Sequence, residues 1–151
     1  MTDRGEMVEE LTQGRRVVES HRPVLASATY RCVAEAAGQA RRFAAKVLDV
    51  FYGTGDERTD NAVLAISEAV ANSAEHSDSR FDGHVTIALF DAGGGVVRAE
   101  ITDDGAATVP TSHQVGNTAT SGRGVFLIEA LTTRSGHFSA QDGRMTFWFE
   151  L

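Results

Sequence analysis

The chain has 151 residues, of which 42% are hydrophobic and 23% are charged, so it is long enough to bury the core of one domain. Its formal net charge of -7 provides no net positive field to attract nucleic acid or an anionic membrane surface over a distance. The single cysteine, Cys32, excludes an intrachain disulfide, and no apolar run approaches the roughly 20 residues of a membrane-spanning helix. We therefore expect one cytoplasmic domain with no direct nucleic-acid partner and no membrane segment.

The first predicted elements follow a polar leader. Residues 1–24 mix acidic residues and arginines with few large apolar ones, and we expect a flexible or weakly helical segment there. Residues 24–32 are rich in β-forming types and predict a first strand. Apolar residues at helical spacing across 34–53 predict a helix that ends at Gly53. The folded domain is expected to span residues 25–151.

A turn-forming link leads into a second helix, expected over Asn61–His76 with Thr59 or Asp60 as its N-cap. Segments 84–92 and 96–104 both alternate between apolar and polar residues, and three glycines separate them. This pattern predicts an antiparallel hairpin.

The last third begins with residues 105–124, which show no periodicity; an unstructured stretch of this length is typical of a functional loop. A third helix is expected over 125–135, ending near Gly136, followed by a hairpin over 137–151 that turns at Asp142-Gly143. The element order predicts an α+β sandwich, in which helices gather on one face of a mostly antiparallel sheet.

The second predicted helix carries three polar residues, Glu68, Asn72 and His76, at intervals of four, which places them on nearly one face of an otherwise apolar helix. One polar residue on an apolar helix is easily explained by a position at the solvent-facing edge. Three such residues in register are explained less well in this way. An asparagine amide oxygen suits Mg²⁺ beside substrate phosphates, and a glutamate one turn away is placed to accept a proton. A zinc site is disfavoured, because an HEXXH spacing and a further ligand cluster are both lacking.

Two further motifs have a plain and a functional interpretation each. In ITDDG, Asp103 either belongs to an ordinary turn or accepts the exocyclic amine of adenine, with Gly105 letting the backbone approach the base. In SGRGVFLIEAL, Gly122 and Gly124 are either loop glycines or a phosphate cradle at a helix N-terminus, to which Arg123 adds a charged contact. Rossmann and P-loop motifs are absent.

Taken in order, Glu68-x-x-x-Asn72-x-x-x-His76, Asp103-x-Gly105 and Gly122-x-Gly124 resemble the N, G1 and G2 boxes of the GHKL ATPase superfamily, which includes sensor histidine kinases, DNA gyrase and the anti-sigma serine kinases. The stretches ARRF, LAISEAVANSAEHS, GRGVFLIEALTTRSG and FWFEL are similar to the small, stand-alone anti-sigma factors of that superfamily. The resemblance covers roughly residues 25–151. It implies the Bergerat fold, with ATP between the helices and a lid loop that joins the last two boxes.

The resemblance also implies an activity, which is transfer of the ATP γ-phosphate to a serine of an anti-anti-sigma protein, together with sigma-factor binding and a homodimer. By position, it implies Glu68 as the general base, Asn72 as the Mg²⁺ ligand and Asp103 as the residue that recognises adenine. The remaining nucleotide contacts that it implies are His76, Gly105, Ser121, Gly122, Arg123 and Gly124.

The last motif departs from its closest pattern, because Thr120 stands before Ser121 where the sporulation-type kinases have an arginine. Loss of a γ-phosphate contact slows transfer more than it weakens ATP binding. The alternative is therefore an ATP-binding regulatory module with little or no kinase turnover, and Glu68 discriminates between the two because a pure binder needs no base. A sensor histidine kinase is not expected, because the residues before the first strand are too few for a dimerising two-helix hairpin.

Overall fold

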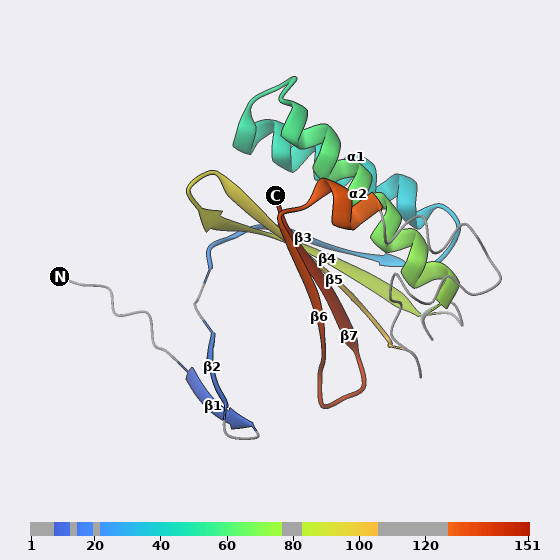
Figure 1. Ribbon diagram of the computed structural model, residues 1–151. Coiled ribbons are helices and arrows are strands. Elements are labelled where there is room, and N and C mark those ends of the chain that lie inside the picture. The colour runs from blue at the N-terminus through green and yellow to red at the C-terminus, as the bar shows by residue number, and fades with distance from the viewer. Residues whose placement is uncertain (1–7, 13–14, 20–21, 77–82, 106–126) are drawn as a thin grey trace.

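The computed structural model describes residues 8–12, 15–19, 22–76, 83–105 and 127–151 (Figure 1). In this part of the chain, residues 127–131 form a further helical segment. The other elements are β1 (Val8–Thr12), β2 (Arg15–Glu19), β3 (Val24–Arg31), α1 (Ala36–Tyr52), α2 (Glu57–His76), β4 (His84–Gly93), β5 (Val96–Asp103), β6 (Arg134–Ser139) and β7 (Met145–Glu150).

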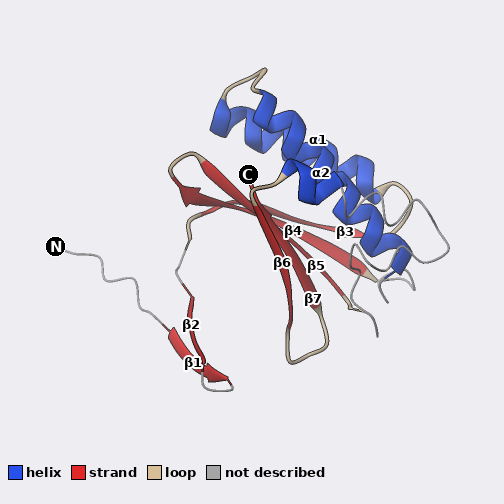
Figure 2. Cartoon of the chain, viewed as in Figure 1, coloured by secondary structure: helices blue, strands red, loops and turns tan. Residues whose placement is uncertain are grey.

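The main sheet has the strand order β3-β4-β5-β7-β6, and each neighbouring pair is antiparallel. Both α1 and α2 lie across the same face of this sheet (Figure 2). This arrangement confirms the predicted α+β sandwich.

The core lies between the helices and the sheet. Alternate residues of β4 and β5 point to the helices, as the period of two in a strand requires. Alanines at intervals of four along α1 allow that helix to approach its neighbours closely. The fully buried residues of these elements include Val85, Ile87 and Leu89 of β4, Val97 and Ala99 of β5, and Ala36, Ala40, Ala44 and Leu48 of α1.

Helix α2 begins at Glu57, four residues earlier than the sequence predicts. The Asp56 Oδ1 atom accepts the backbone N–H of Arg58 at 2.9 Å, which is the contact that an N-cap makes with the second helical residue. Thr59 is instead 4% exposed and lies within the first helical turn. The prediction of Thr59 or Asp60 as the cap is therefore wrong, because packing draws Thr59 into the interior.

The third predicted helix is shorter at its C-terminal end than expected, since β6 already begins at Arg134. The Thr132 hydroxyl and backbone N–H both donate to the carbonyl of Ile128, which closes the last helical turn. The backbone N–H of Thr133 then donates to the carbonyl of Glu150 at 2.8 Å. Pairing with β7 thus ends the helix, a non-local effect that local propensity does not show.

The leader contains a small hairpin, in which β1 pairs antiparallel with β2. A weakly helical leader is therefore the wrong prediction for these residues. Figure 1 shows the hairpin away from the main sandwich. The domain boundary near residue 24 remains a prediction.

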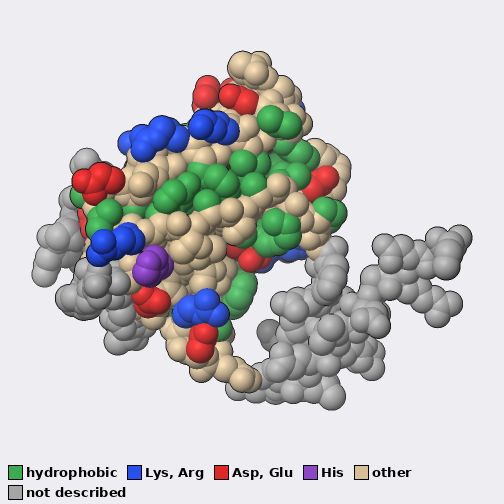
Figure 3. Space-filling view, turned by 180° about the vertical axis from the view of Figure 1, so that it is seen from behind, with side chains coloured by type: hydrophobic (Ala, Val, Ile, Leu, Met, Phe, Trp, Pro, Cys, Tyr) green, Lys and Arg blue, Asp and Glu red, His purple; other side chains and the backbone are tan. Residues whose placement is uncertain are grey.

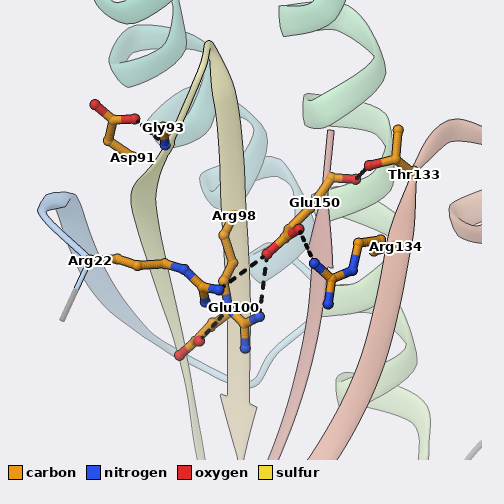
Figure 4. A network of polar contacts seen from close by, with 8 residues as sticks. All are labelled: Arg22, Asp91, Gly93, Arg98, Glu100, Thr133, Arg134 and Glu150. Atoms are coloured by element: carbon orange, nitrogen blue, oxygen red, sulfur yellow. Dashed lines mark hydrogen bonds and ion pairs between the residues drawn. The ribbon is translucent and has the colours of Figure 1, made fainter. Parts of the chain in front are cut away.

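A polar network on the helix-free face of the sheet joins four parts of the chain (Figure 4). Glu150 of β7 lies 3.6 Å from each of three arginine side chains, those of Arg22, Arg98 and Arg134. Arg98 also donates to Glu100 at 2.7 Å, and its guanidinium lies 4.0 Å from the ring centroid of Trp148. Because Glu150 and Arg98 are mostly buried, these contacts satisfy charges that would be costly to bury alone.

The surface opposite the view of Figure 1 is chemically mixed. A band of hydrophobic side chains crosses it, with basic and acidic side chains both above and below the band (Figure 3). No single sign of charge dominates this view.

Candidate functional site

The candidate site centres on Asp103, the last residue of β5, which is 9% exposed. Its Oδ2 atom accepts a hydrogen bond from the Ser73 hydroxyl at 2.6 Å, and its Oδ1 atom accepts one from the backbone N–H of Gly105 at 2.7 Å. Hydrogen bonds to an ionised acceptor are shorter and stronger than neutral ones. The carboxylate is therefore held between helix α2 and the turn that follows β5.

The periodicities of a helix and a strand explain why Ser73 of α2 meets Asp103 of β5. Along α2, residues spaced by three and four form a buried stripe, which comprises Thr59, Ala62, Ile66, Ala69 and Ser73. Along β5, Asp103 follows Val97, Ala99 and Ile101 on the strand face that points to the helices. A serine at the end of the helical stripe thus meets an aspartate at the end of the strand.

Glu68 and Asn72 lie on the neighbouring face of α2 and are both half-buried. Among the described residues, neither makes a side-chain hydrogen bond or an ion pair. A half-buried amide and carboxylate, one helical turn apart, are suited to a polar ligand. Because Asn72 directly precedes Ser73, the helix fixes the amide relative to the Asp103 carboxylate.

Gly105 has a positive φ of 77°, and a Cβ atom there would overlap the carbonyl oxygen of Gly143 in the turn between β6 and β7. The sequence interpretation gave this glycine the task of letting a base approach. The structure gives a second reason for a glycine at position 105, which is close packing against Gly143. This reason applies whether or not a ligand is bound.

Cys32 lies just after β3 and is close enough to Asp103 for the charge of that carboxylate to affect its thiol. It is 8% exposed, and burial is the main cause that raises the pKa of its thiol, with smaller contributions from the charges of Asp103 and Asp104. Burial therefore disfavours the thiolate, which is the reactive form of this side chain.

The model of the histidine kinase-like ATPase domain family matches residues 32–149. The chain belongs to this family. A crystal structure of the RsbU and RsbW domains of Rv1364c from Mycobacterium tuberculosis has a similar fold, with a TM-score of 0.58, 22% identity and coverage of 90% of the present chain. The present chain spans 33% of that protein chain, about a third of its length. No curated protein matches the sequence significantly.

Membership of the histidine kinase-like ATPase family confirms the superfamily that the three motifs resemble and implies ATP binding. The site residues fit such a ligand. Asp103 is a buried acceptor at a strand end, while Glu68 and Asn72 supply a half-buried carboxylate and amide on the helix that contacts it. A buried acceptor suits an amine donor such as that of adenine, and the amide oxygen suits a hard cation held mainly by phosphates.

Four of the residues that the family resemblance implies, Ser121, Gly122, Arg123 and Gly124, lie outside the described residues. His76 is the last residue of α2, and its side chain also lies outside the description. The chain is described again from residue 127, and Ile128 is 1% exposed in the core. The helical segment that follows the motif is therefore anchored in the sandwich.

Within the described ranges, no group of three or more His, Cys, Asp or Glu side chains is arranged to hold a metal ion. No helix in the same part of the chain has the length and apolar character needed to cross a bilayer.

The sequence interpretation did not identify Ser73 or assign Cys32 a place in the site. A signal for Ser73 exists, because most buried side-chain hydroxyls have a hydrogen-bond partner. The identity of that partner, 30 positions further along the chain, is not readable from the helix alone.

Proposed function

We propose that this ATPase-family domain is a cytoplasmic serine-protein kinase of the anti-sigma type. It phosphorylates an anti-anti-sigma protein, binds a sigma factor and works as a homodimer. The observation that carries this proposal is the placing of Glu68 and Asn72, both half-buried, on the helix that contacts the buried Asp103. The similarity of four sequence stretches to small anti-sigma factors supports the choice of subgroup, and the single cysteine supports a reducing compartment.

In this proposal, Asp103 accepts a hydrogen bond from the adenine amine, and the glycine-containing segment Ser121–Gly124, with Arg123 and His76, contacts the phosphates. Asn72 holds Mg²⁺, which neutralises developing phosphate charge when bound. Because Gly105 has no side chain, the backbone at this position can approach the adenine base closely.

The carboxylate of Glu68 accepts the proton of the attacking serine hydroxyl. The serine oxygen forms a bond to the γ-phosphorus as the bond from that phosphorus to the bridging oxygen breaks. The products are a phosphoserine protein and ADP.

The test uses labelled ATP and candidate anti-anti-sigma proteins from the same genome, with Glu68→Gln and Asp60→Asn variants. Asp60 is an exposed acidic residue on the same helix and serves as the matched control. We expect the Glu68→Gln variant to bind ATP nearly as the wild type does and to lose phosphate transfer by about a hundredfold or more. The Asp60→Asn variant keeps both properties.

Equal transfer by the wild type and the Glu68→Gln variant would exclude Glu68 as the base. Binding of ATP and sigma factor with no transfer by the wild type would instead identify a binding module. The absence of Arg at position 120, where Thr120 stands, makes that outcome worth measuring directly.

A further inference from the structure

We propose that Ser73 is a specificity-determining residue for the nucleobase, acting by positioning the Asp103 carboxylate. This inference rests on the proposed function, in which Asp103 recognises adenine. Ser73 is an unspecified position of the first motif, which gives it no role; the structure shows its contact with Asp103.

The geometry gives Ser73 this role. Its hydroxyl donates to Oδ2 of Asp103 at 2.6 Å, while the N–H of Gly105 donates to Oδ1 at 2.7 Å. These two donors, one to each oxygen, constrain both the torsion of the side chain and the plane of the carboxylate. A carboxylate has about four acceptor positions, and these two donors take two of them.

Burial makes the contact consequential. Ser73 is 7% exposed and Asp103 is 9% exposed, so water competes poorly for this hydrogen bond. Without the hydroxyl, Oδ2 loses a short donor that water replaces poorly, so the carboxylate is held less firmly in one plane. An acceptor whose direction varies contributes less to a ligand that needs one direction.

Base selection follows from the chemistry of position 6 of the purine. Adenine presents an amine donor there, which a carboxylate binds, whereas hypoxanthine presents a carbonyl oxygen, which a carboxylate repels. A firmly oriented Asp103 therefore favours ADP over inosine diphosphate. A loosely oriented one favours ADP less.

The experiment measures ADP and inosine diphosphate affinities by calorimetry for the full chain and three variants. The Ser73→Ala variant lacks the hydroxyl, whereas the Ser73→Thr variant keeps one. Ser67→Ala is the matched control, because Ser67 is another buried serine of α2, 4% exposed, whose partner is Arg41 at 3.1 Å and not Asp103. Urea unfolding of each variant verifies the fold.

We expect Ser73→Ala to weaken ADP binding by roughly tenfold and to change inosine diphosphate binding by less than about twofold, so that base selectivity falls. The Ser73→Thr variant should keep most of the wild-type selectivity for ADP, and the Ser67→Ala variant should keep all of it.

Three results overturn the inference. These are unchanged ADP affinity in a folded Ser73→Ala variant, equal weakening of both nucleotides, and equal loss of selectivity in Ser67→Ala. Failure of the wild type to bind ADP is a different result, because it removes the proposed function and this inference with it.

Discussion

Replacement of Gly105 by alanine separates a structural reason for this glycine from a nucleotide-binding one. Its φ of 77° lies in the left-handed region, and the added Cβ would overlap the carbonyl oxygen of Gly143. The variant must therefore accept strain in its own backbone or move the turn between β6 and β7. Both costs arise in the protein without nucleotide.

The magnitude is the sum of two effects. An L-residue in the left-handed region costs roughly 1–2 kcal/mol, and forcing extra volume into a packed site typically costs a further 1–3 kcal/mol. We expect Gly105→Ala to lower the free energy of unfolding by about 2–5 kcal/mol, a large share of the roughly 5–15 kcal/mol that such domains possess.

Gly93→Ala is the matched control. Gly93 has a φ of 86°, and nothing lies within 4 Å of the position that its Cβ would take. It therefore bears the backbone cost of roughly 1–2 kcal/mol without the overlap. The difference between the two variants isolates packing against Gly143.

The assay is urea unfolding of both variants and of the wild type, without nucleotide, followed by circular dichroism. A larger loss for Gly105→Ala supports the packing argument. Equal losses would refute it and would leave approach of the base as the reason for this glycine.

Two further predictions concern a surface cap and a core anchor. Hydrogen bonds from the side chain and then the backbone of Arg58 lower the pKa of Asp56 from 3.8 to about 2, so this carboxylate stabilises the fold above its unfolded pKa and loses that contribution as the pH falls through about 2. Carbon-detected NMR titration should show that midpoint and its return toward 3.8 in Arg58→Ala; a native midpoint near 3.8 would contradict the capping contact. Ile128 is 1% exposed, so Ile128→Ala should reduce the free energy of unfolding by about 2–5 kcal/mol, whereas Glu129→Ala, at an exposed neighbouring position, should change it by less than about 0.5 kcal/mol. Similar urea midpoints for these two variants would show that the helical segment at 127–131 is not anchored in the core.

Features that depend on local periodicity were predictable from the sequence. The alternation in β4 and β5 reflects a single buried face, and the buried alanines of α1 recur at helical spacing. The relative positions of Glu68 and Asn72 follow from the same geometry. These predictions need no knowledge of distant parts of the chain.

Features that depend on distant partners were not predictable in this way. Thr59 has the chemistry of an N-cap, yet packing buries it and Asp56 caps the helix. Residues 132–136 continue a helical pattern, yet pairing with β7 begins a strand at Arg134. Likewise, the contacts of Asp103 with Ser73 and of Gly105 with the Gly143 turn join positions far apart in sequence.

The position of β7 in the sheet has a consequence for synthesis on the ribosome. This strand, Met145–Glu150, lies between β5 and β6, so β5 leaves the ribosome well before its second neighbour has been made. At about 5–20 residues per second, the exposed edge of β5 waits several seconds for that neighbour. An unpaired edge is a template for strands of other chains. The nascent protein is therefore open to edge-to-edge aggregation during that interval, and a chaperone that shields the β5 edge would act at that time.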